Sequence, residues 1–586
     1  MQKRNLKSLG FLLAPSVFYM VVFFLAPMII LILYSFWRTE GFEIIKTFSI
    51  SNYSRVLSEK INWILIYRSI LMGLLVSFIT LLLSFPAAYG LTFNPRLNRY
   101  KDYFLFMILI AMFSSYLIRV YAWRTILGDF GIINQFLIAT RIIKEPLEFL
   151  LYSRTAVVIA LVHILTPFTI LPVYSSMQNI NPELLRASRD LGANSLKTTL
   201  KIVMPLCRSG LISGFIFSFI LATGDYVIPA LLGGKSGLMI GKLISDMFGT
   251  LYDWGGGAAL TVVLIICLFA AFFAVIFLFK FFAMFEKLGR KLNRRDLRIQ
   301  PSKIQDKENY KLKAGKKIHP WNSFLYYLKK IPGFEIYTII FLIYMFAPAL
   351  IIIFFSFNAG RAPTLPVTGF TLNWYKTILT DSNFQLAIRN SLIIAVLVSI
   401  GAGIIGTAAA FAFKRFEFKF KNTAHYLLIF PITIPGLLLG ISLLSFFVLL
   451  KIPLNLGTVI LGHLVFTIPF VYLNVGASLE NFNETIEEAA RDLGANSFKV
   501  FLKITLPIIK SGIIGGMLIA FALSFDEFIV TFFIIGGGQN TVPMLIFSML
   551  RRGIKPTINA ISSLVLIASF IFISIANRVT RLKVRL

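Results

Sequence analysis

Long apolar runs alternate with short polar segments along this chain, and the pattern predicts membrane-spanning helices. The runs have about 20 residues each, the length that an α-helix needs to cross the hydrocarbon core of a bilayer. We place them at 11–36, 69–92, 103–127, 155–177, 209–232, 258–284, 334–357, 387–413, 424–450, 457–478, 510–535 and 557–577. The expected fold class is therefore an all-α polytopic membrane protein with about 12 transmembrane helices.

A polar, strongly basic stretch separates the first six predicted spans from the last six. It has too few apolar residues to bury a core, so we interpret it as a linker. The sequence thus predicts a first transmembrane domain at 1–285, a basic cytoplasmic linker at 286–333 and a second transmembrane domain at 334–586. The first span is too long for the apolar region of a signal peptide, which has roughly 7 to 15 residues.

Composition agrees with a lipid environment and gives the orientation. Hydrophobic residues make up 57% of the 586 residues, and the formal net charge is +31. The basic residues cluster in alternate loops between the apolar runs, as cytoplasmic loops do, so the charge does not indicate binding to nucleic acid. We therefore expect a multi-pass protein with both termini and residues 286–333 in the cytoplasm.

The heptapeptide RDLGANS occurs at 189–195 and again at 491–497. The two copies are 491 − 189 = 302 residues apart, and residues 186–206 align without gaps to 488–508. Each copy falls in the fourth loop of its set of six spans. Tandem duplication explains this placement, and an even number of spans between the copies predicts parallel repeats related by an axis along the membrane normal.

Each copy predicts a short helix, a glycine and a second short helix. Gly192 and Gly494 suit the position after a helix, where φ is positive. The Asn-Ser pair that follows each glycine can cap the next helix. Two helices joined at a fixed angle would form a stiff projection from the membrane.

The second copy with its flanks, EAARDLGANSFKVFLKITLP, resembles the EAA loop of ABC importer permeases. In that family the short helix inserts into a cleft on a cytosolic ATPase. The resemblance implies ATPase coupling through Arg186, Ala187, Asp190, Gly192, Glu488, Ala489, Asp492 and Gly494. The first copy departs from the pattern, because Arg186 stands where the second has Glu488 and Ser188 where it has Ala490; this difference argues against equal contacts with two ATPase subunits. A helix lying on the membrane surface would not explain the repetition at matched positions.

Other stretches resemble the spermidine/putrescine importers. TGDYVIPALLGG (223–234) and YLIRVYAWRTILGDFGIIN (116–134) are similar to their first permease subunit, and FTLNWYKTIL (370–379) and LSFDEFIVTFFI (523–534) to their second. The resemblance implies both subunits fused in one chain, as two tandem six-helix type I transmembrane domains that form a pathway for polyamines. Permeases for ferric iron, opines, aminoethylphosphonate and thiamine share much of this sequence and remain alternatives.

The same resemblance implies partners and a location. It implies a dimeric cytosolic ATPase, a periplasmic or lipoprotein solute-binding protein, and a bacterial inner membrane. The chain itself is not expected to be an enzyme or to hold a cofactor. GGKS at 233–236 is not a P-loop, because Pro229 stands where the first glycine is needed and no α/β domain surrounds it. A secondary transporter with two parallel halves, driven by an ion gradient, is the alternative from another class.

Acidic residues within the predicted spans are candidates for the solute path, because ionisable groups at membrane depth are costly. Asp225 lies near the end of the fifth span, and Asp526 and Glu527 lie at the matching place of the second half. Tyr226, Phe525 and Phe528 surround them, a setting that suits a flexible polycation. Alternatively, the acids cap a broken helix or pair with Arg119 or Arg124.

The remaining polar candidates carry less weight. Cys207 and Cys267 lie in or beside apolar runs, and the four histidines show no metal-ligand spacing, so no metal site is expected. His163 and His463 occupy roughly corresponding places in the fourth spans, where we expect packing histidines.

Overall fold

The computed structural model describes residues 6–296 and 333–580, except 42, 361–362, 365–366, 481 and 554. The described part of the first half contains α1 (Leu6–Met20), η1 (Val21–Leu25), α2 (Ala26–Phe36), β1 (Arg38–Glu40), β2 (Glu43–Ile45), α3 (Ser51–Ser58), α4 (Lys60–Phe93), α5 (Pro95–Asn98), α6 (Lys101–Phe113), α7 (Tyr116–Leu127), α8 (Ile132–Ala139), η2 (Glu148–Leu150), α9 (Arg154–Gln178), α10 (Pro182–Asp190), α11 (Ser195–Thr198), η3 (Thr199–Val203), α12 (Met204–Leu206), α13 (Arg208–Thr223), α14 (Val227–Leu232), α15 (Ile240–Gly249) and α16 (Trp254–Asp296). The strands β1 and β2 form an antiparallel hairpin.

The second half repeats this order of helices. Its described elements are α18 (Gly333–Ser356), α19 (Asn373–Thr380), α20 (Ser382–Arg415), α21 (Lys421–Ile429), η4 (Phe430–Thr433), α22 (Gly436–Leu449), α23 (Leu456–Glu480), α24 (Thr485–Asp492), α25 (Ser497–Val500), η5 (Phe501–Thr505), α26 (Leu506–Asp526), α27 (Ile529–Ile534), α28 (Val542–Arg552) and α29 (Pro556–Thr580). Helix α16 continues past residue 285, where we placed the end of the first domain. Residues 297–332, most of the predicted linker, lie outside the described residues, and the division at 285 and 334 stays a prediction.

The spans match the apolar runs, but several of them are not straight. Within the described residues, 9 helices are long and apolar enough to cross a membrane, and 12 spans result if each sharply bent pair counts as one. The bends measure 86° between α6 and α7, 74° before α13 and 107° between η4 and α22. The last bend follows from Pro435, which holds Ile434 in an extended conformation and ends the helix. The apolar runs predicted as spans at 103–127 and 424–450 thus each contain a sharp bend, which the hydrophobic pattern did not indicate.

The predicted fifth spans are also interrupted. In the first half the helix stops at Thr223 and restarts at Val227, and in the second it stops at Asp526 and restarts at Ile529. Carboxylates at these breaks offer the free backbone N–H groups a partner, which a continuous apolar helix would not require. The offset of 302 residues holds here, since 529 − 227 = 302 and 534 − 232 = 302. The breaks are therefore a repeated feature of both halves.

The two halves exchange their first helices. Helices α1 and α2 pack on α20 and α22 of the second half, while α18 packs on α4, α6 and α7 of the first. The Tyr19 hydroxyl in α1 donates a 2.5 Å hydrogen bond to the carbonyl of Leu461 in α23. Conversely, the Tyr337 hydroxyl in α18 donates to the carbonyl of Leu83 in α4 at 2.6 Å. The first helix of each half thus packs against the other half.

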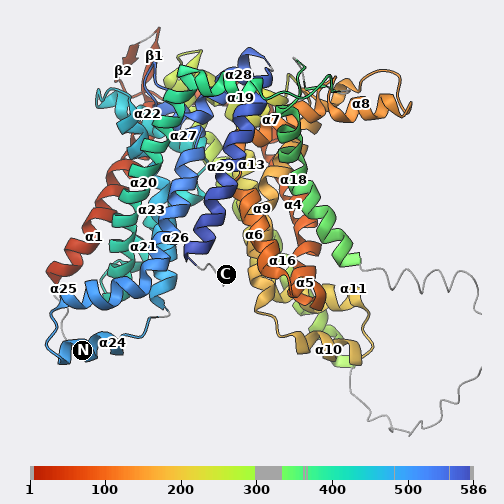
Figure 1. Ribbon diagram of the computed structural model, residues 1–586. Helices are drawn as coiled ribbons and strands as arrows, with labels where there is room; N and C mark the ends of the chain where they lie inside the picture. Colours follow the sequence, from red (N-terminus) through yellow and green to blue (C-terminus); the bar gives the residue numbers. More distant parts are fainter. Residues whose placement is uncertain are drawn as a thin grey trace, which may run out of the picture.

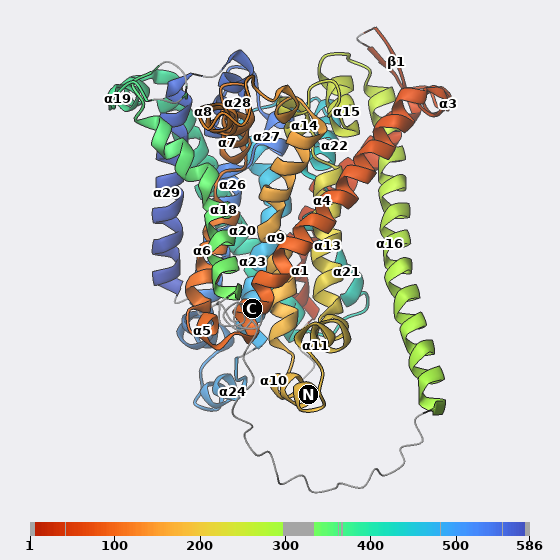
Figure 2. The same ribbon diagram turned by 90° about the vertical axis from the view of Figure 1, so that its right-hand side faces the viewer.

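The bundle consists of two legs that join at one end and spread at the other (Figure 1). One leg contains α1, α20 and α23, and the other contains α4, α9 and α18. Helices α10 and α24 lie at the spread end, which we call the elbow end, while β1, α8 and α28 lie at the opposite end (Figures 1 and 2). Helices α10 and α24, which lead into the repeated motif, are therefore far from the breaks that follow Thr223 and Asp526.

Candidate functional site

The repeated heptapeptide forms two elbows, residues 182–198 and 485–500, with nearly the same backbone. Gly192 has φ +79° and Gly494 has φ +84°, the left-handed conformation that favours glycine. The N–H of each glycine donates to the carbonyl three residues earlier, Arg189 at 2.8 Å and Arg491 at 2.9 Å. The predicted helix endings are confirmed.

Asparagine side chains start the second helix of both elbows. The side-chain oxygen of Asn194 accepts the N–H of Lys197 at 2.8 Å, and that of Asn496 accepts the N–H of Lys499 at 2.8 Å. These caps satisfy one of the free N–H groups at a helix start. The glycine and the asparagine together set the angle of each elbow.

The predicted coupling residues all lie on the exposed surface of the elbows. They are Arg186, Ala187, Asp190 and Gly192 of the first elbow and Glu488, Ala489, Asp492 and Gly494 of the second. The sequence interpretation missed Leu191 and Leu493, whose side chains are each 89% exposed at the tips. Each elbow thus presents one apolar side chain at the equivalent place of its tip.

At the opposite end, two of the predicted acids cap the broken spans. Asp225 Oδ1 accepts the N–H of Ile228 at 2.9 Å at the start of α14. Glu527 Oε1 accepts the N–H of Val530 at 2.9 Å at the start of α27. Because 527 − 225 = 302, Glu527 is the counterpart of Asp225. The helix-capping alternative therefore describes both residues, whereas Asp526 has a different role.

Tyr116, the first residue of α7, joins acids from both halves. Its backbone N–H donates to Asp526 Oδ2 at 2.8 Å, and its hydroxyl donates to Asp225 Oδ2 at 2.5 Å. Asp526 thus caps α7 across the boundary between the halves, 410 residues away in sequence. We call Tyr116, Asp225, Asp526 and Glu527 the acidic junction.

The predicted arginine partners do not form ion pairs with these acids. Within the described part of the chain, none of the three carboxylates lies within 4 Å of a basic nitrogen. Arg119 donates to the carbonyl of Ile164 at 3.3 Å, and Arg124 to the carbonyl of Leu550 at 2.7 Å. Within the described residues, the guanidinium groups of Arg119 and Arg124 thus hydrogen-bond backbone carbonyls and do not contact the three carboxylates directly.

Aromatic rings surround the acidic junction, although not all those predicted. The ring of Tyr226 lies 6.0 Å from Phe532 and 5.8 Å from Phe533, so it packs across the boundary between the halves. Among the described residues, the buried Tyr226 hydroxyl has no hydrogen-bond partner. Phe525 instead stacks on Phe521 within α26, at 6.1 Å. Tyr226 is thus the aromatic residue with an unused polar group at this place.

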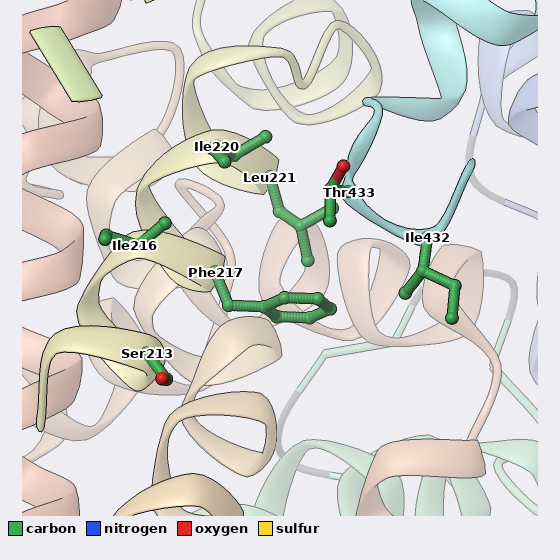
Figure 3. Close-up of a pocket in the computed structure, with 7 residues that line it drawn as sticks. All are labelled: Ser213, Ile216, Phe217, Ile220, Leu221, Ile432 and Thr433. Atoms are coloured by element: carbon green, nitrogen blue, oxygen red, sulfur yellow. The ribbon is translucent and has the colours of Figure 1, made fainter. Parts of the chain in front are cut away.

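An apolar cavity of about 220 Å³ lies on the elbow side of the junction, between α13 and η4. The side chains of Phe217 and Leu221 point toward Ile432 and Thr433 of the other half (Figure 3). Ser213, Ile216 and Ile220 complete the lining. The cavity begins about one turn of α13 before Asp225. Carboxylates and an apolar cavity are thus arranged in series along the boundary.

The two predicted packing histidines are buried but do not correspond. Helices α9 and α23 keep the 302-residue offset, so His163 matches Val465 rather than His463. His463 bonds the Ser524 and Thr531 hydroxyls, each at 2.8 Å, and so links α26 to α27. His163 contacts the carbonyl of Met345 in the exchanged helix α18 at 3.2 Å. Both contacts are those of packing residues.

The sequence of this chain matches a known protein family. The model of the family described as binding-protein-dependent transport system inner membrane component matches residues 65–284 and again 402–585. The Escherichia coli K12 putrescine transport system permease protein PotI is 38% identical over 230 residues, 38% of this chain and 82% of PotI.

Two further relatives come from the same organism. The spermidine/putrescine transport system permease protein PotC is 32% identical over 242 residues, 41% of this chain and 91% of PotC. PotB of the same system is 32% identical over 249 residues, 42% of this chain and 89% of PotB. Each relative has the length of about one half of this chain, and the family model matches twice. The chain therefore belongs to the inner membrane components of binding-protein-dependent ABC transport systems, with two permease domains in one polypeptide.

Proposed function

We propose that this chain forms the pathway of an ATP-driven polyamine importer, and that a separate cytosolic ATPase dimer moves its halves through the two elbows. The relatives whose names specify putrescine or spermidine suggest the solute class. The observation that carries the proposal is the acidic junction, where Asp225 of one half and Asp526 of the other meet at Tyr116.

The chemistry of the junction suits a chain with several ammonium groups. An ammonium can take the place of the Tyr116 donors at Asp225 and Asp526, since charge-assisted hydrogen bonds are stronger than neutral ones. Tyr226 can contribute a cation–π contact of about 0.5 to 2 kcal/mol. The methylene segments of the solute can then contact the apolar lining of the cavity between α13 and η4.

Coupling to the ATPase uses the elbow end, which the proposal places in the cytoplasm together with both termini. The exposed tips Leu191 and Leu493 offer apolar surface to the ATPase. When the ATPase dimer closes, the elbows approach each other and the legs follow, so that the pathway opens toward the opposite side. A solute-binding protein delivers the polyamine at that side.

The proposal is tested with the complete complex in proteoliposomes, with the ATPase and the binding protein. Asp225→Asn and Asp526→Asn remove charge but keep a side-chain oxygen that can accept the N–H of Ile228 or Tyr116. We expect ATP-driven uptake of spermidine or putrescine to fall at least about tenfold, because a charge-assisted contact of roughly 1.4 kcal/mol or more is lost. The complexes should assemble normally.

Asp381→Asn is the matched control. Asp381 caps α20 through the N–H of Asn383 at 2.7 Å, outside the acidic junction. Asp381→Asn should leave uptake unchanged. This control shows whether weakening a helix cap is by itself enough to lower uptake. Unchanged polyamine uptake in both junction variants would refute the polyamine pathway, and uptake of ferric iron alone would change the solute. Transport by the chain without any ATPase would instead favour an ion-driven carrier.

A further inference from the structure

The second elbow is anchored by a buried ionic network at its base. Glu487, on the inner side of α24, is 4% exposed. Its Oε1 accepts from Arg415 Nη2 at the end of α20 at 2.6 Å, and from the Thr505 hydroxyl of η5 at 2.5 Å. Its Oε2 lies 3.4 Å from Nη2 of Arg491. One carboxylate therefore ties three elements together.

Arg415 is equally enclosed. Its side chain is 8% exposed, and its Nη1 lies 3.2 Å from Glu484 at the start of the elbow. The guanidinium group also lies over the ring of Phe482, 5.4 Å from the centroid. A planar guanidinium with two carboxylate partners and a ring beneath it has a defined orientation. The network therefore fixes α24 relative to α20 in direction as well as in distance.

The first elbow has apolar residues at the same three places. The 302-residue offset makes Leu185 the counterpart of Glu487, and Val203 the counterpart of Thr505. Helices α4 and α20 correspond with an offset of 382 − 60 = 322, which makes Phe93 the counterpart of Arg415. Leu185 and Val203 are buried in one apolar cluster, and Phe93 packs against it. Glu487 and its two closest partners, Arg415 and Thr505, are thus all replaced by apolar residues in the first elbow.

At a neighbouring pair of positions the first elbow is polar and the second is apolar. In the first elbow the Ser188 hydroxyl bonds the Thr198 hydroxyl at 2.9 Å, while the counterparts in the second are Ala490 and Val500. Within each elbow, the residues that contact one another at these positions are therefore either all polar or all apolar. Replacing one partner alone would leave a buried polar group or charge without a partner.

The two anchors have different mechanical properties. Apolar contacts are non-directional, so Leu185 can shift on its neighbours with little change in contact area. The network of Glu487 and Arg415 either keeps its hydrogen bonds or loses them, because a buried charge without its partner is strongly unfavourable. Helix α20 packs along α1, α23 and α26, in the leg that contains α1 and α23. A displacement of α24 through this network therefore moves the whole leg.

We propose that Glu487 and Arg415 are positioning residues that make the second elbow and α20 one rigid body. The first elbow instead packs on apolar residues, which allow α10 to shift relative to α4. This inference rests on the proposed function, because it assumes that an ATPase pushes on the elbows. A movement of α24 that the ATPase drives is then transmitted fully to α20. The two elbows are therefore not interchangeable.

The test measures uptake and ATP hydrolysis in the same proteoliposomes and compares solute moved per ATP. Glu487→Gln keeps the shape of the side chain but removes its charge. Arg415→Lys keeps the charge but cannot hold Glu484 and Glu487 with one planar group. Each should lower the solute moved per ATP by about tenfold, the scale of one lost charge-assisted bond, while the ATPase still binds and hydrolyses ATP. A ratio equal to that of the original chain in both variants would overturn the proposal.

A transplant separates positioning from folding. Glu487→Leu alone strands Arg415 in a buried site and should impair assembly. Adding Thr505→Val and Arg415→Phe copies the first elbow, so assembly should recover while the solute moved per ATP stays low. Full recovery of that ratio would show that an apolar base is sufficient and would contradict the inference. Leu185→Met, a change of similar volume in the first elbow, is the matched control and should leave the ratio unchanged.

The proposed function fails separately from this inference. If the unaltered complex shows no ATP-dependent uptake, the elbows do not serve an ATPase and the proposed function is wrong. If that complex transports normally and the Glu487 and Arg415 variants couple equally well, only the positioning role is wrong.

Discussion

Single residues fix the elbows because their requirements are local. Gly192 and Gly494 have the positive φ that side chains disfavour, and no atom outside the local backbone lies within 4 Å of a Cβ added at either position. The space is therefore free, and the backbone conformation alone selects glycine. This is why the sequence was sufficient to predict both turns.

Gly192→Val should destabilise the first elbow by about 1 to 2 kcal/mol, the cost of placing a β-branched residue in the left-handed region. Gly192→Asn should cost less, because asparagine tolerates that region. Hydrogen exchange of the amides of residues 182–198 measures the difference. Gly476→Val, in α23 with free space around it, is the steric control. Equal exchange in the valine and asparagine variants would contradict the backbone explanation.

Tyr116 acts at the same scale, but through contacts that are distant in sequence. Tyr116→Phe removes the hydroxyl bond to Asp225 and keeps the backbone bond to Asp526. A hydrogen bond to a charged group contributes about 1.5 to 3 kcal/mol, so the closed junction should be weaker. We expect ATP hydrolysis in the absence of solute to rise several-fold in the reconstituted complex. Tyr67→Phe, at an exposed site, should have no effect; a rise in that control would point to a general loss of stability instead.

At the scale of elements, the interruptions of the fifth spans bring the halves together. Gly224, at the end of α13, faces Pro435 before α22, and a Cβ there would lie 2.4 Å from the proline Cβ. Asp526 is the counterpart of Gly224, since 526 − 224 = 302, and it contacts the start of α7 instead. Glycine has no side chain that could accept an N–H, whereas the Asp526 carboxylate accepts that of Tyr116, so the two breaks make different contacts with the opposite half.

Gly224→Ala should therefore hold α13 and α22 apart and lower ATP-driven uptake. Overpacking of this kind costs about 1 to 3 kcal/mol, which predicts a loss of roughly tenfold or more. Gly249→Ala, with nothing within 4 Å of the added methyl group, is the control. Unchanged uptake would mean that the contact with Pro435 is not part of the working cycle.

At the scale of the whole molecule, the exchange of α1 and α18 makes each half depend on the other. Tyr19 and Tyr337 bond the opposite halves, and one large apolar core contains residues of both. The apolar halves therefore form one structural unit, irrespective of whether a covalent connection is present.

If residues 297–332 are omitted and the two halves are produced together as separate polypeptides, they should therefore assemble. We expect residues 1–296 and 333–586 to co-purify from detergent. A second piece that begins at residue 357, and so lacks α18, should associate far more weakly, because α4, α6 and α7 lose the helix that packs on them. Equal recovery of the shorter piece would show that the exchanged helix does not hold the halves together.

The sequence alone determined the spans, the duplication and the elbows. Each depends on nearby residues: an apolar run long enough for the bilayer, a repeated heptapeptide, a glycine followed by an asparagine. It also singled out Asp225, Asp526 and Glu527 as polar residues within the spans, although it could not divide them between capping a helix and joining the halves. Their role in a solute path stays a prediction.

Only the tertiary structure decided which residues meet across the boundary. The bonds of Tyr116 to Asp225 and Asp526, the helix exchange and the ionic base of the second elbow all join segments far apart in the chain. Such contacts depend on how helices pack, and hydrophobic periodicity specifies which face of a helix is buried but not its neighbour. The buried charge of Glu487 was hidden in the sequence for this reason, because on a polar loop helix it looks like any other exposed acid.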